Sequence, residues 1–253
     1  PLPPFPGSRR PAAEAGISLG IQDSPAALVA KVKAAVAAGY RRVKVKIKPG
    51  ADYAYLAAVR RAFPDLLLMA DANSAYTLAD RDHLKALDEL GLTMIEQPLA
   101  AGDLVEHARL QAAIQTPICL DESIVTLADA KAMVALKAGR VINLKVARVG
   151  GLTPARQILA FARTHGIDCW VGGMVDGGVG RAVNLALATL DGISLPNDLS
   201  ASRRFFNADI ITPPVTLNGN QVPVPHRPGL GFAINWPVVA RYQQGPAWTL
   251  AAD

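Results

Sequence analysis

The sequence predicts a TIM-type (β/α) barrel, and the first observation behind this prediction is a regular spacing of charged residues. Five of them recur at intervals of 25, 25, 25 and 24 residues: Lys46, Asp71, Glu96, Asp121 and Lys145. Each closes a short apolar run, and one strand plus one helix takes about that length. Side chains at the carboxyl ends of barrel strands face one mouth. We therefore expect these five side chains to form a ring there.

Length and composition set the domain organisation. With 253 residues, of which 51% are hydrophobic, the chain is long enough for one large core. We expect a proline-rich lead over residues 1–15, the barrel over 16–195, and a C-terminal tail over 196–253 that packs on the barrel. No further domain, such as a cap over the barrel mouth, is expected within the chain.

Charge and hydropathy exclude several classes of partner. The net charge is +5, but the basic residues are scattered and form no stripe of the kind that binds nucleic acid. No apolar run reaches the roughly 18 residues that span a bilayer, and no secretory signal is visible. We expect a cytoplasmic protein with no nucleic-acid or membrane partner.

The first βα unit carries clear signals. Residues 16–21 read as a short strand, and the helix after it begins at Pro25, with Ser24 as its cap and Gly39 at its end. A strictly alternating second strand follows at 41–48. The remaining units are expected as strands at 66–71, 93–98, 118–123, 140–146, 167–174 and 192–195, and as helices at 52–63, 77–90, 103–115, 126–139, 153–166 and 177–190.

Alternation in the second strand places lysines inside the barrel. Val43 and Val45 should face the helices, so Lys44 and Lys46 point inward, where an ammonium group is costly without anionic partners. The expected partners are the three carboxylates of the ring. The same parity places apolar side chains below that ring: Met69, Met94 and Cys119.

The ring also predicts a chemistry. Three converging carboxylates repel one another unless a cation neutralises them, and hard oxygen ligands suit Mg²⁺ or Mn²⁺. Such an ion stabilises the enediolate that forms when a carboxylic acid loses its α-proton, and a neutral lysine can take that proton. Lys46 and Lys145 would reach opposite faces of the substrate, which permits either inversion or elimination.

The motifs at these positions resemble the enolase superfamily, muconate-lactonizing subgroup: KVKIKPG, DAN at Asp71, IEQP at Glu96, DES at Asp121 and LK at Lys145. Within it, KIKPG, GGM, LPNDLSAS and VPVPHRPGLGF are most similar to o-succinylbenzoate synthases and N-acylamino acid racemases. The resemblance implies Lys46, Lys145 and Lys44 as catalytic residues, Asp71, Glu96 and Asp121 as metal ligands, and Asn73, Gly172, Gly173 and Met174 as residues that contact the substrate.

The resemblance implies dehydration to 2-succinylbenzoate in menaquinone biosynthesis, with racemisation of N-acylamino acids as the alternative, because both use the same ring. Members of the family carry an N-terminal capping domain, and none is visible here. We therefore expect a fragment, a homo-oligomer or a separate capping chain, and a catalytically impaired barrel remains a third reading. Two features stay open: the role of Asp176, where the family has Glu, and whether the glycine-rich segment 177–183 is a phosphate cradle.

Overall fold

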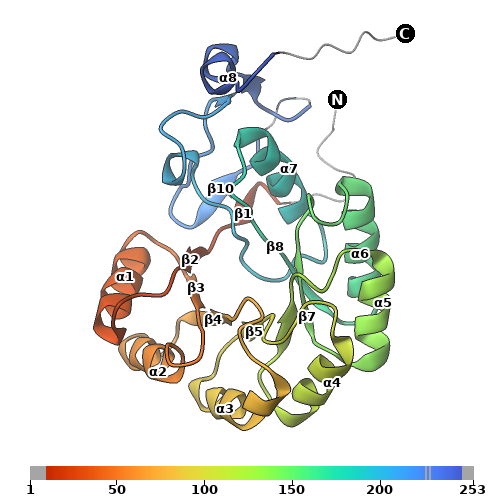
Figure 1. The fold of residues 1–253 in the computed structure, drawn as a ribbon. Coiled ribbons are helices and arrows are strands. Elements are labelled where there is room, and N and C mark those ends of the chain that lie inside the picture. Colours follow the sequence, from red (N-terminus) through yellow and green to blue (C-terminus); the bar gives the residue numbers. More distant parts are fainter. Residues whose placement is uncertain (1–9, 226, 228, 247–253) are drawn as a thin grey trace.

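A curled parallel sheet of seven strands forms the centre of the protein, whose computed structural model describes residues 10–225, 227 and 229–246. Neighbouring strands follow one another in sequence order, as a (β/α) barrel requires. Helices cover the outer face of the curl (Figure 1). The strands are β2 (Ile17–Leu19), β3 (Arg42–Lys46), β4 (Leu67–Asp71), β5 (Met94–Glu96), β6 (Ile118–Leu120), β7 (Val141–Leu144) and β8 (Asp168–Val171).

The helices alternate with these strands as predicted. Ser24 accepts a hydrogen bond from the Ala27 amide at 3.2 Å and so caps the first helix, which starts at Pro25. The expected helix at 77–90 is divided into three shorter helices. The helices are α1 (Pro25–Ala37), α2 (Tyr53–Ala62), η1 (Leu78–Asp80), α3 (Arg81–Ala86), η2 (Leu87–Leu90), α4 (Leu104–Ala113), α5 (Leu127–Leu136), α6 (Leu152–Thr164) and α7 (Gly178–Ala188).

Strand alternation divides the core in two. The outward set, which includes Val43 and Val45, joins a large cluster between sheet and helices. The inward set forms a separate small cluster inside the barrel: Met69, Met94, Cys119, Val141 and Trp170. The predicted apolar layer below the ring is therefore present, and it supports the polar layer above it.

The eighth strand, expected at 192–195, is not a regular strand. Ile193 makes a single parallel bridge to Cys169, and the Asp198 amide donates to the Val171 carbonyl at 2.9 Å. Between them Pro196 has no N–H to donate, and the Asn197 side chain, in place of a backbone carbonyl, accepts from the Val171 amide at 2.7 Å. Individual hydrogen bonds, in place of a regular strand ladder, thus join β8 to residues 193–198. We call this junction the seam.

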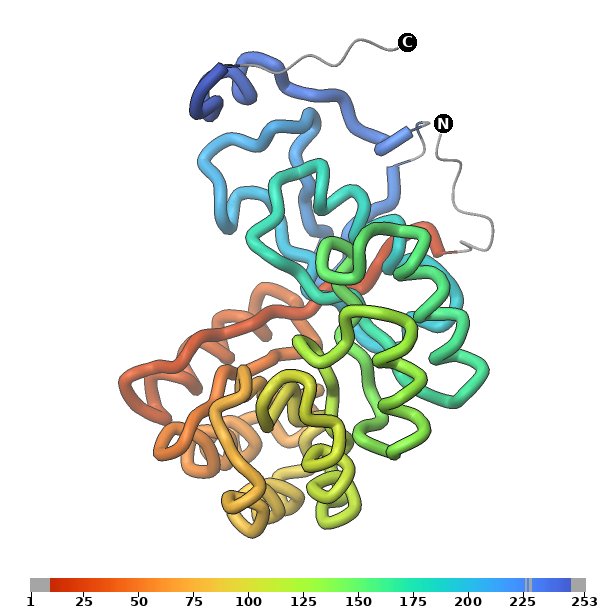
Figure 2. The backbone as a smooth tube through the Cα atoms, turned by 45° about the vertical axis from the view of Figure 1, so that its right-hand side comes forward, coloured from red at the N-terminus to blue at the C-terminus, as the bar shows by residue number. Residues whose placement is uncertain are grey.

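The tail packs beside the seam and recruits part of the lead. Strand β1 (Ala12–Glu14) pairs antiparallel with β10 (Gln221–Pro223). Just before β10 the chain turns at Gly219 and Asn220, and an antiparallel bridge joins Asn218 to Gln221 across this turn. These segments lie together on one side of the barrel (Figure 2). The other tail elements are η3 (Ser202–Arg204), the pair β9 (Ile211–Thr212) and β11 (Ala233–Ile234), and α8 (Trp236–Tyr242).

Two predictions extend beyond the described residues. Positions 1–9 of the expected lead and 247–253 of the expected tail lie outside them, so the three-part division stays a prediction. Within the described ranges, no helix is long and apolar enough to cross a membrane.

Candidate active site

The predicted ring forms at the carboxyl ends of β3 to β7. In the sheet Lys46 pairs with Asp71 and Asp71 pairs with Glu96, so these side chains emerge from adjacent strands on one face. Asp121 directly follows β6 and Lys145 directly follows β7. The three carboxylates are almost completely buried, whereas Lys46 and Lys145 are partly exposed. A reactant at the mouth would therefore meet the lysines while the acids lie beneath.

Lys44 is a buried cation with three anionic partners. Its Nζ lies 2.8 Å from Glu96 Oε2, 3.1 Å from Asp71 Oδ2 and 3.3 Å from Asp198 Oδ2. It also lies 4.7 Å from the centre of the Trp170 ring, a favourable cation–π distance. Burial opposes the charged form, but the three carboxylates outweigh it and raise the pKa of Lys44 well above its ordinary value. Lys44 thus remains charged at neutral pH.

Glu96 lies deepest of the three acids. One carboxylate oxygen accepts from Lys44, and the other accepts from Asn143 Nδ2 at 2.6 Å. Burial raises its pKa to about 7, with Lys44 opposing this shift and the charges of Asp71 and Asp121 adding to it. Burial, and then the charges of the two neighbouring acids, thus make Glu96 the acid that is hardest to ionise of the two whose pKa is shifted.

Lys46 and Asn73 meet above Asp71. The Lys46 ammonium donates to Asp71 Oδ2 at 2.6 Å and also to the Asn73 side-chain oxygen. Asn73 has a φ of 42°, a left-handed conformation that asparagine tolerates better than most residues. The backbone amide of Asn73 also donates to Asp71 Oδ1 at 3.2 Å. Asn73 therefore holds both Asp71 and Lys46 in place.

Asp121 anchors the opposite side of the ring. Its Oδ2 accepts from Lys145 Nζ at 2.8 Å, and its Oδ1 forms an ion pair with the Arg148 guanidinium. Burial opposes ionisation, but Arg148 and Lys145 together lower the pKa of Asp121 below its usual range. Lys46 and Lys145 thus stand on two sides of the buried acids, each bound to a carboxylate.

The donor set suits a hard divalent cation, although the acids are paired with other groups in this structure. Among the described residues, no three His, Cys, Asp or Glu side chains converge in the arrangement of a metal site. Instead, the ammonium and guanidinium groups described above occupy the carboxylate oxygens. Three buried carboxylates on adjacent strands are the ligand type that Mg²⁺ prefers. The pKa of Glu96 is raised first by burial and then by the two other acids, and a bound cation would offset both effects.

The predicted substrate residues flank the ring at the end of β8. A Cβ at Gly172 would overlap the Asn143 side chain, and a Cβ at Gly173 would lie 2.6 Å from the Asp198 carbonyl. Glycine is thus required at both positions by close packing around the ring. Gly173 and Met174 line a cavity of about 300 Å³, which Asp198 also lines.

Four further residues hold the ring in place and were not predicted as site residues. Asn143 binds Glu96, Arg148 binds Asp121, and Gln97 Oε1 accepts from the Asp121 amide at 3.0 Å. Asp198 binds Lys44 and also forms an ion pair with buried Arg42 at 2.8 Å. Asp198 lies about one βα repeat after β8, and that interval was the available signal.

The glycine-rich segment 177–183 is not a free phosphate cradle. The Gly178 amide at the start of α7 donates to Asp209 Oδ1 at 2.8 Å, so a carboxylate of the chain itself occupies this helix N-terminus. Asp176 accepts from the Met174 amide at 2.9 Å and from Asn184 at 3.1 Å. Asp176 therefore fixes the loop that carries Met174.

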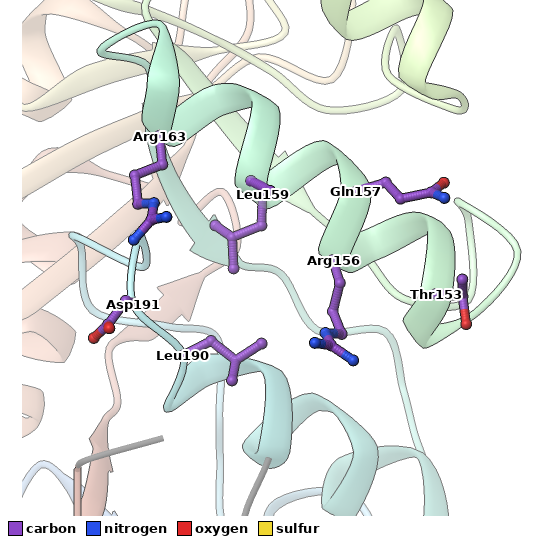
Figure 3. Close-up of a pocket in the computed structure, with 8 residues that line it drawn as sticks. Thr153, Arg156, Gln157, Leu159, Arg163, Leu190 and Asp191 are labelled. Carbon is purple, nitrogen blue, oxygen red and sulfur yellow. The ribbon is translucent and has the colours of Figure 1, made fainter. Parts of the chain in front are cut away.

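A second cavity, of about 490 Å³, lies on the outside of the barrel between α6 and the end of α7. Arg156, Leu159 and Arg163 point from α6 towards Leu190 and Asp191 (Figure 3). No ring residue lines it, so the chemistry proposed below does not use it.

Comparisons with known proteins agree with this geometry. Residues 27–238 match the family described as enolase C-terminal domain-like. An o-succinylbenzoate synthase of Geobacillus stearothermophilus is 52% identical over 244 residues, which cover 96% of this chain and 65% of the relative. An N-succinylamino acid racemase of Thermus thermophilus is 48% identical over 235 residues, covering 93% and 64%. The chain therefore spans just under two thirds of the length of these relatives.

Solved structures share the fold. An enolase superfamily member from Listeria innocua superposes with a TM-score of 0.93 at 43% identity, covering 94% of this chain and 64% of that one. A dipeptide epimerase from Enterococcus faecalis, complexed with Mg and the dipeptide L-Leu-L-Tyr, superposes with a TM-score of 0.83 at 29% identity, over 90% and 65%. The curled seven-stranded sheet of this chain therefore belongs to the fold that these proteins share.

Proposed function

Because the chain belongs to the enolase C-terminal domain-like family, we propose that it is the catalytic barrel of an enzyme that removes the α-proton of a carboxylic acid. The observation that carries this proposal is the pair of lysines on two sides of three buried acids. Lys46 is bound to Asp71 at 2.6 Å, and Lys145 is bound to Asp121 at 2.8 Å. A substrate placed between them presents one face to each amine.

Lys46 is the acid/base residue in this proposal, and Lys44 is its helper. A lysine that gives up its proton becomes a base for a weakly acidic C–H bond, which is general base catalysis. Lys44 does not serve as the base, because the carboxylates around it, Asp198 first among them, raise its pKa and keep it protonated. Lys145 approaches from the other side, either as a second base or as a fixed positive charge.

Asp71, Glu96 and Asp121 would hold Mg²⁺ or Mn²⁺. The ion would supply positive charge beside the substrate carboxylate, which makes the neighbouring C–H bond more acidic. For the ion to bind, Lys44, Lys46 and Lys145 must release some of the carboxylate oxygens that they now occupy. Asp198 remains as a partner for Lys44, and Arg148 remains on Asp121.

Dehydration to 2-succinylbenzoate is the first candidate reaction, because the 52% identical relative carries the name o-succinylbenzoate synthase. Lys46 takes the α-proton and, as the resulting ammonium, returns a proton to the neighbouring hydroxyl group, which leaves as water, so Lys145 is needed only as a positive charge. Racemisation of N-succinylamino acids is the second candidate, and it needs both lysines as acid and base. The two candidates therefore assign different duties to Lys145.

An isotope-exchange experiment separates the candidates. In D₂O with Mg²⁺ and each enantiomer of an N-succinylamino acid, two-base chemistry predicts that Lys46→Ala abolishes α-hydrogen exchange from one enantiomer and Lys145→Ala from the other. Each loss should exceed about a hundredfold. Lys48→Ala, which changes an exposed lysine two residues beyond Lys46, should keep both exchanges.

The outcomes are distinct. Turnover of the cyclohexadiene acid that yields 2-succinylbenzoate, without exchange of either N-succinylamino acid enantiomer, favours the synthase. Exchange by the double variant at the unmutated rate would contradict the proposed roles of both lysines. The assay is made on the 253-residue chain and on any longer native polypeptide that contains it.

A homo-oligomer or a separate capping chain as partner, and a cytoplasmic location, remain part of the proposal. A covered mouth would exclude water from the ring and strengthen its electrostatic interactions. Sedimentation of the chain alone, and of its mixture with any candidate capping chain, measures whether either complex forms.

A further inference from the structure

The cavity of about 300 Å³ beside the ring combines apolar walls with one accessible cation. Met174, Val175 and Phe205 line it with exposed fractions of 56%, 70% and 44%, which is high for large apolar side chains. Such side chains gathered around one cavity indicate an apolar ligand segment. The cavity is also lined by Asp198, so it lies next to the ring through Lys44.

Arg204 supplies the cation. One of its terminal nitrogens donates to the Ser18 carbonyl at 2.6 Å, which anchors the side chain to β2. Its guanidinium carbon lies 5.5 Å from the centre of the Phe205 ring, a cation–π contact that orients the group further. Arg204 is exposed and lines the cavity. A fixed guanidinium of this kind matches the geometry of a carboxylate.

A second arginine adds to the positive charge on this wall. The guanidinium carbon of Arg181 lies 5.2 Å from the centre of the Phe205 ring, so Phe205 contacts both arginines. Arg181 also donates to the Ser200 hydroxyl at 3.0 Å. One terminal nitrogen of this buried arginine has no partner. Burial lowers the pKa of Arg181, and the charge of Arg204 lowers it further, against Asp176 and Asp209. An anion near this pair would relieve the repulsion between the two guanidinium groups.

Asp198, the other charged residue of the cavity lining, does not cancel Arg204. Its carboxylate is already bound to Arg42, Lys44 and the Ser18 hydroxyl, with the two cations at 2.8 Å and 3.3 Å. Arg42 offsets the charge of Asp198, whereas Lys44 is shared with Asp71 and Glu96. The charge of Arg204 is therefore left over on the cavity wall and favours an anionic ligand.

We propose that this cavity binds a substrate arm made of a short apolar chain that ends in a carboxylate, and that Arg204 binds that carboxylate. The inference rests on the proposed function, in which the reacting carbon lies over the ring and the rest of the substrate extends sideways. An N-succinyl group has this chemistry, since two methylene groups separate its carbonyl from its carboxylate. Arg204 is thus assigned as the residue that distinguishes a succinyl arm from an uncharged acyl arm.

The test compares two ligands by isothermal titration calorimetry on the 253-residue chain with Mg²⁺ present. N-succinylglycine has an arm that ends in a carboxylate, and N-pentanoylglycine has an arm of the same length that ends in a methyl group. The unmutated chain should bind N-succinylglycine about tenfold more tightly, the size of one charge-assisted contact. Arg204→Gln should remove that preference while changing N-pentanoylglycine binding less than about twofold.

Two variants serve as controls. Arg203→Gln removes the adjacent exposed arginine, which does not line the cavity, and should keep the preference. Arg204→Lys keeps the charge but not the forked geometry, so it should keep part of the preference. Melting temperatures of all three variants check that the fold persists.

Several results would overturn the proposal. The unmutated chain could fail to bind N-succinylglycine or show no preference for it. Arg204→Gln could lose the same affinity for both ligands, or Arg203→Gln could lose the preference as well. Isotope exchange by Lys46 and Lys145 is measured separately on the same preparations. If isotope exchange is absent but the ligand preference is present, only the proposed chemistry is contradicted. If exchange is present but the preference is absent, only the cavity assignment is contradicted.

Discussion

At the residue scale, Glu96 and Asp121 carry the same functional group, yet their surroundings shift their pKa values in opposite directions. Both are buried, which disfavours the ionised form. Asp121 has Arg148 and Lys145 on its two oxygens, so its pKa falls. Glu96 has one cation and one amide as partners and faces two other carboxylates, so its pKa rises to about 7. A difference in partners, not in burial, separates the two acids.

Glu96 therefore predicts a pH dependence of stability when divalent cations are removed. The folded chain holds a proton up to about pH 7, whereas the unfolded chain releases it near the ordinary pKa of 4.5. Because the unfolded state binds fewer protons in this window, the free energy of unfolding should fall as pH rises from about 4.5 to 7, by up to about 3 kcal/mol. Urea titrations in EDTA at several pH values give the free energy of unfolding, and its fall with pH should be shallower for Glu96→Gln than for the unmutated chain. The same pH dependence in both proteins would argue against a raised pKa.

At the element scale, Asp52 shows how one side chain connects three segments. It caps α2 by accepting from the Tyr53 amide at 2.6 Å. Its other oxygen accepts from the Tyr76 hydroxyl and contacts the His83 ring, each at 2.8 Å. Tyr76 belongs to the loop after β4 that also carries Asn73. Asp52 thus couples the start of a helix to the loop that positions Lys46.

Replacement of Asp52 should consequently cost more than a helix cap alone. Asp52→Ala removes the cap and leaves the buried Tyr76 hydroxyl without its acceptor, so we expect a loss of about 2–4 kcal/mol. Chemical denaturation measures it, and Asp65→Ala, at an exposed position, should stay within about 0.5 kcal/mol. In Tyr76→Phe the cost of Asp52→Ala should shrink. An unchanged cost in that background would mean that the two side chains are not coupled.

At the scale of the whole molecule, side chains complete what the backbone leaves open at the seam. Arg42 is fully buried, and its guanidinium carbon lies 5.1 Å from the centre of the Trp170 ring. It donates to the Pro196 carbonyl at 3.0 Å and pairs with Asp198. A Cβ at Gly16 would overlap its guanidinium, so glycine makes room for it. This ion pair joins β3 to the irregular eighth position.

Asp198→Asn should accordingly weaken the barrel as a whole. It leaves Arg42 buried without a carboxylate, a change that costs about 3–5 kcal/mol for buried pairs. Removing both members in Arg42→Met/Asp198→Asn should cost less than the sum of the single variants, since neither charge is then left alone. Urea unfolding measures all four proteins, and Asp191→Asn serves as an exposed control. Strict additivity would show that the pair does not hold the seam.

Much of the fold and of the ring could be predicted from the sequence, because both depend on local periodicity. Spacing near 25 residues and the alternation in 41–48 are consequences of strand and helix geometry, which each segment carries by itself. The inward layer of Met69, Met94 and Cys119 follows from the same parity and is confirmed. The resemblance to the enolase superfamily, which rested on the motifs around the ring, is confirmed by the family match.

Tertiary structure alone decided how the ring is held and how the barrel closes. Asp198 meets Lys44 across 154 positions of sequence, and no local pattern connects residues so far apart. Gly172 was expected at the substrate, but its requirement for glycine comes from the Asn143 side chain, a neighbour that only folding supplies. The eighth position is irregular because Asn197 bonds through its side chain, and β1 pairs with β10 because their edges meet in space. Periodicity records which face a residue occupies, whereas its partners are set by packing between distant segments.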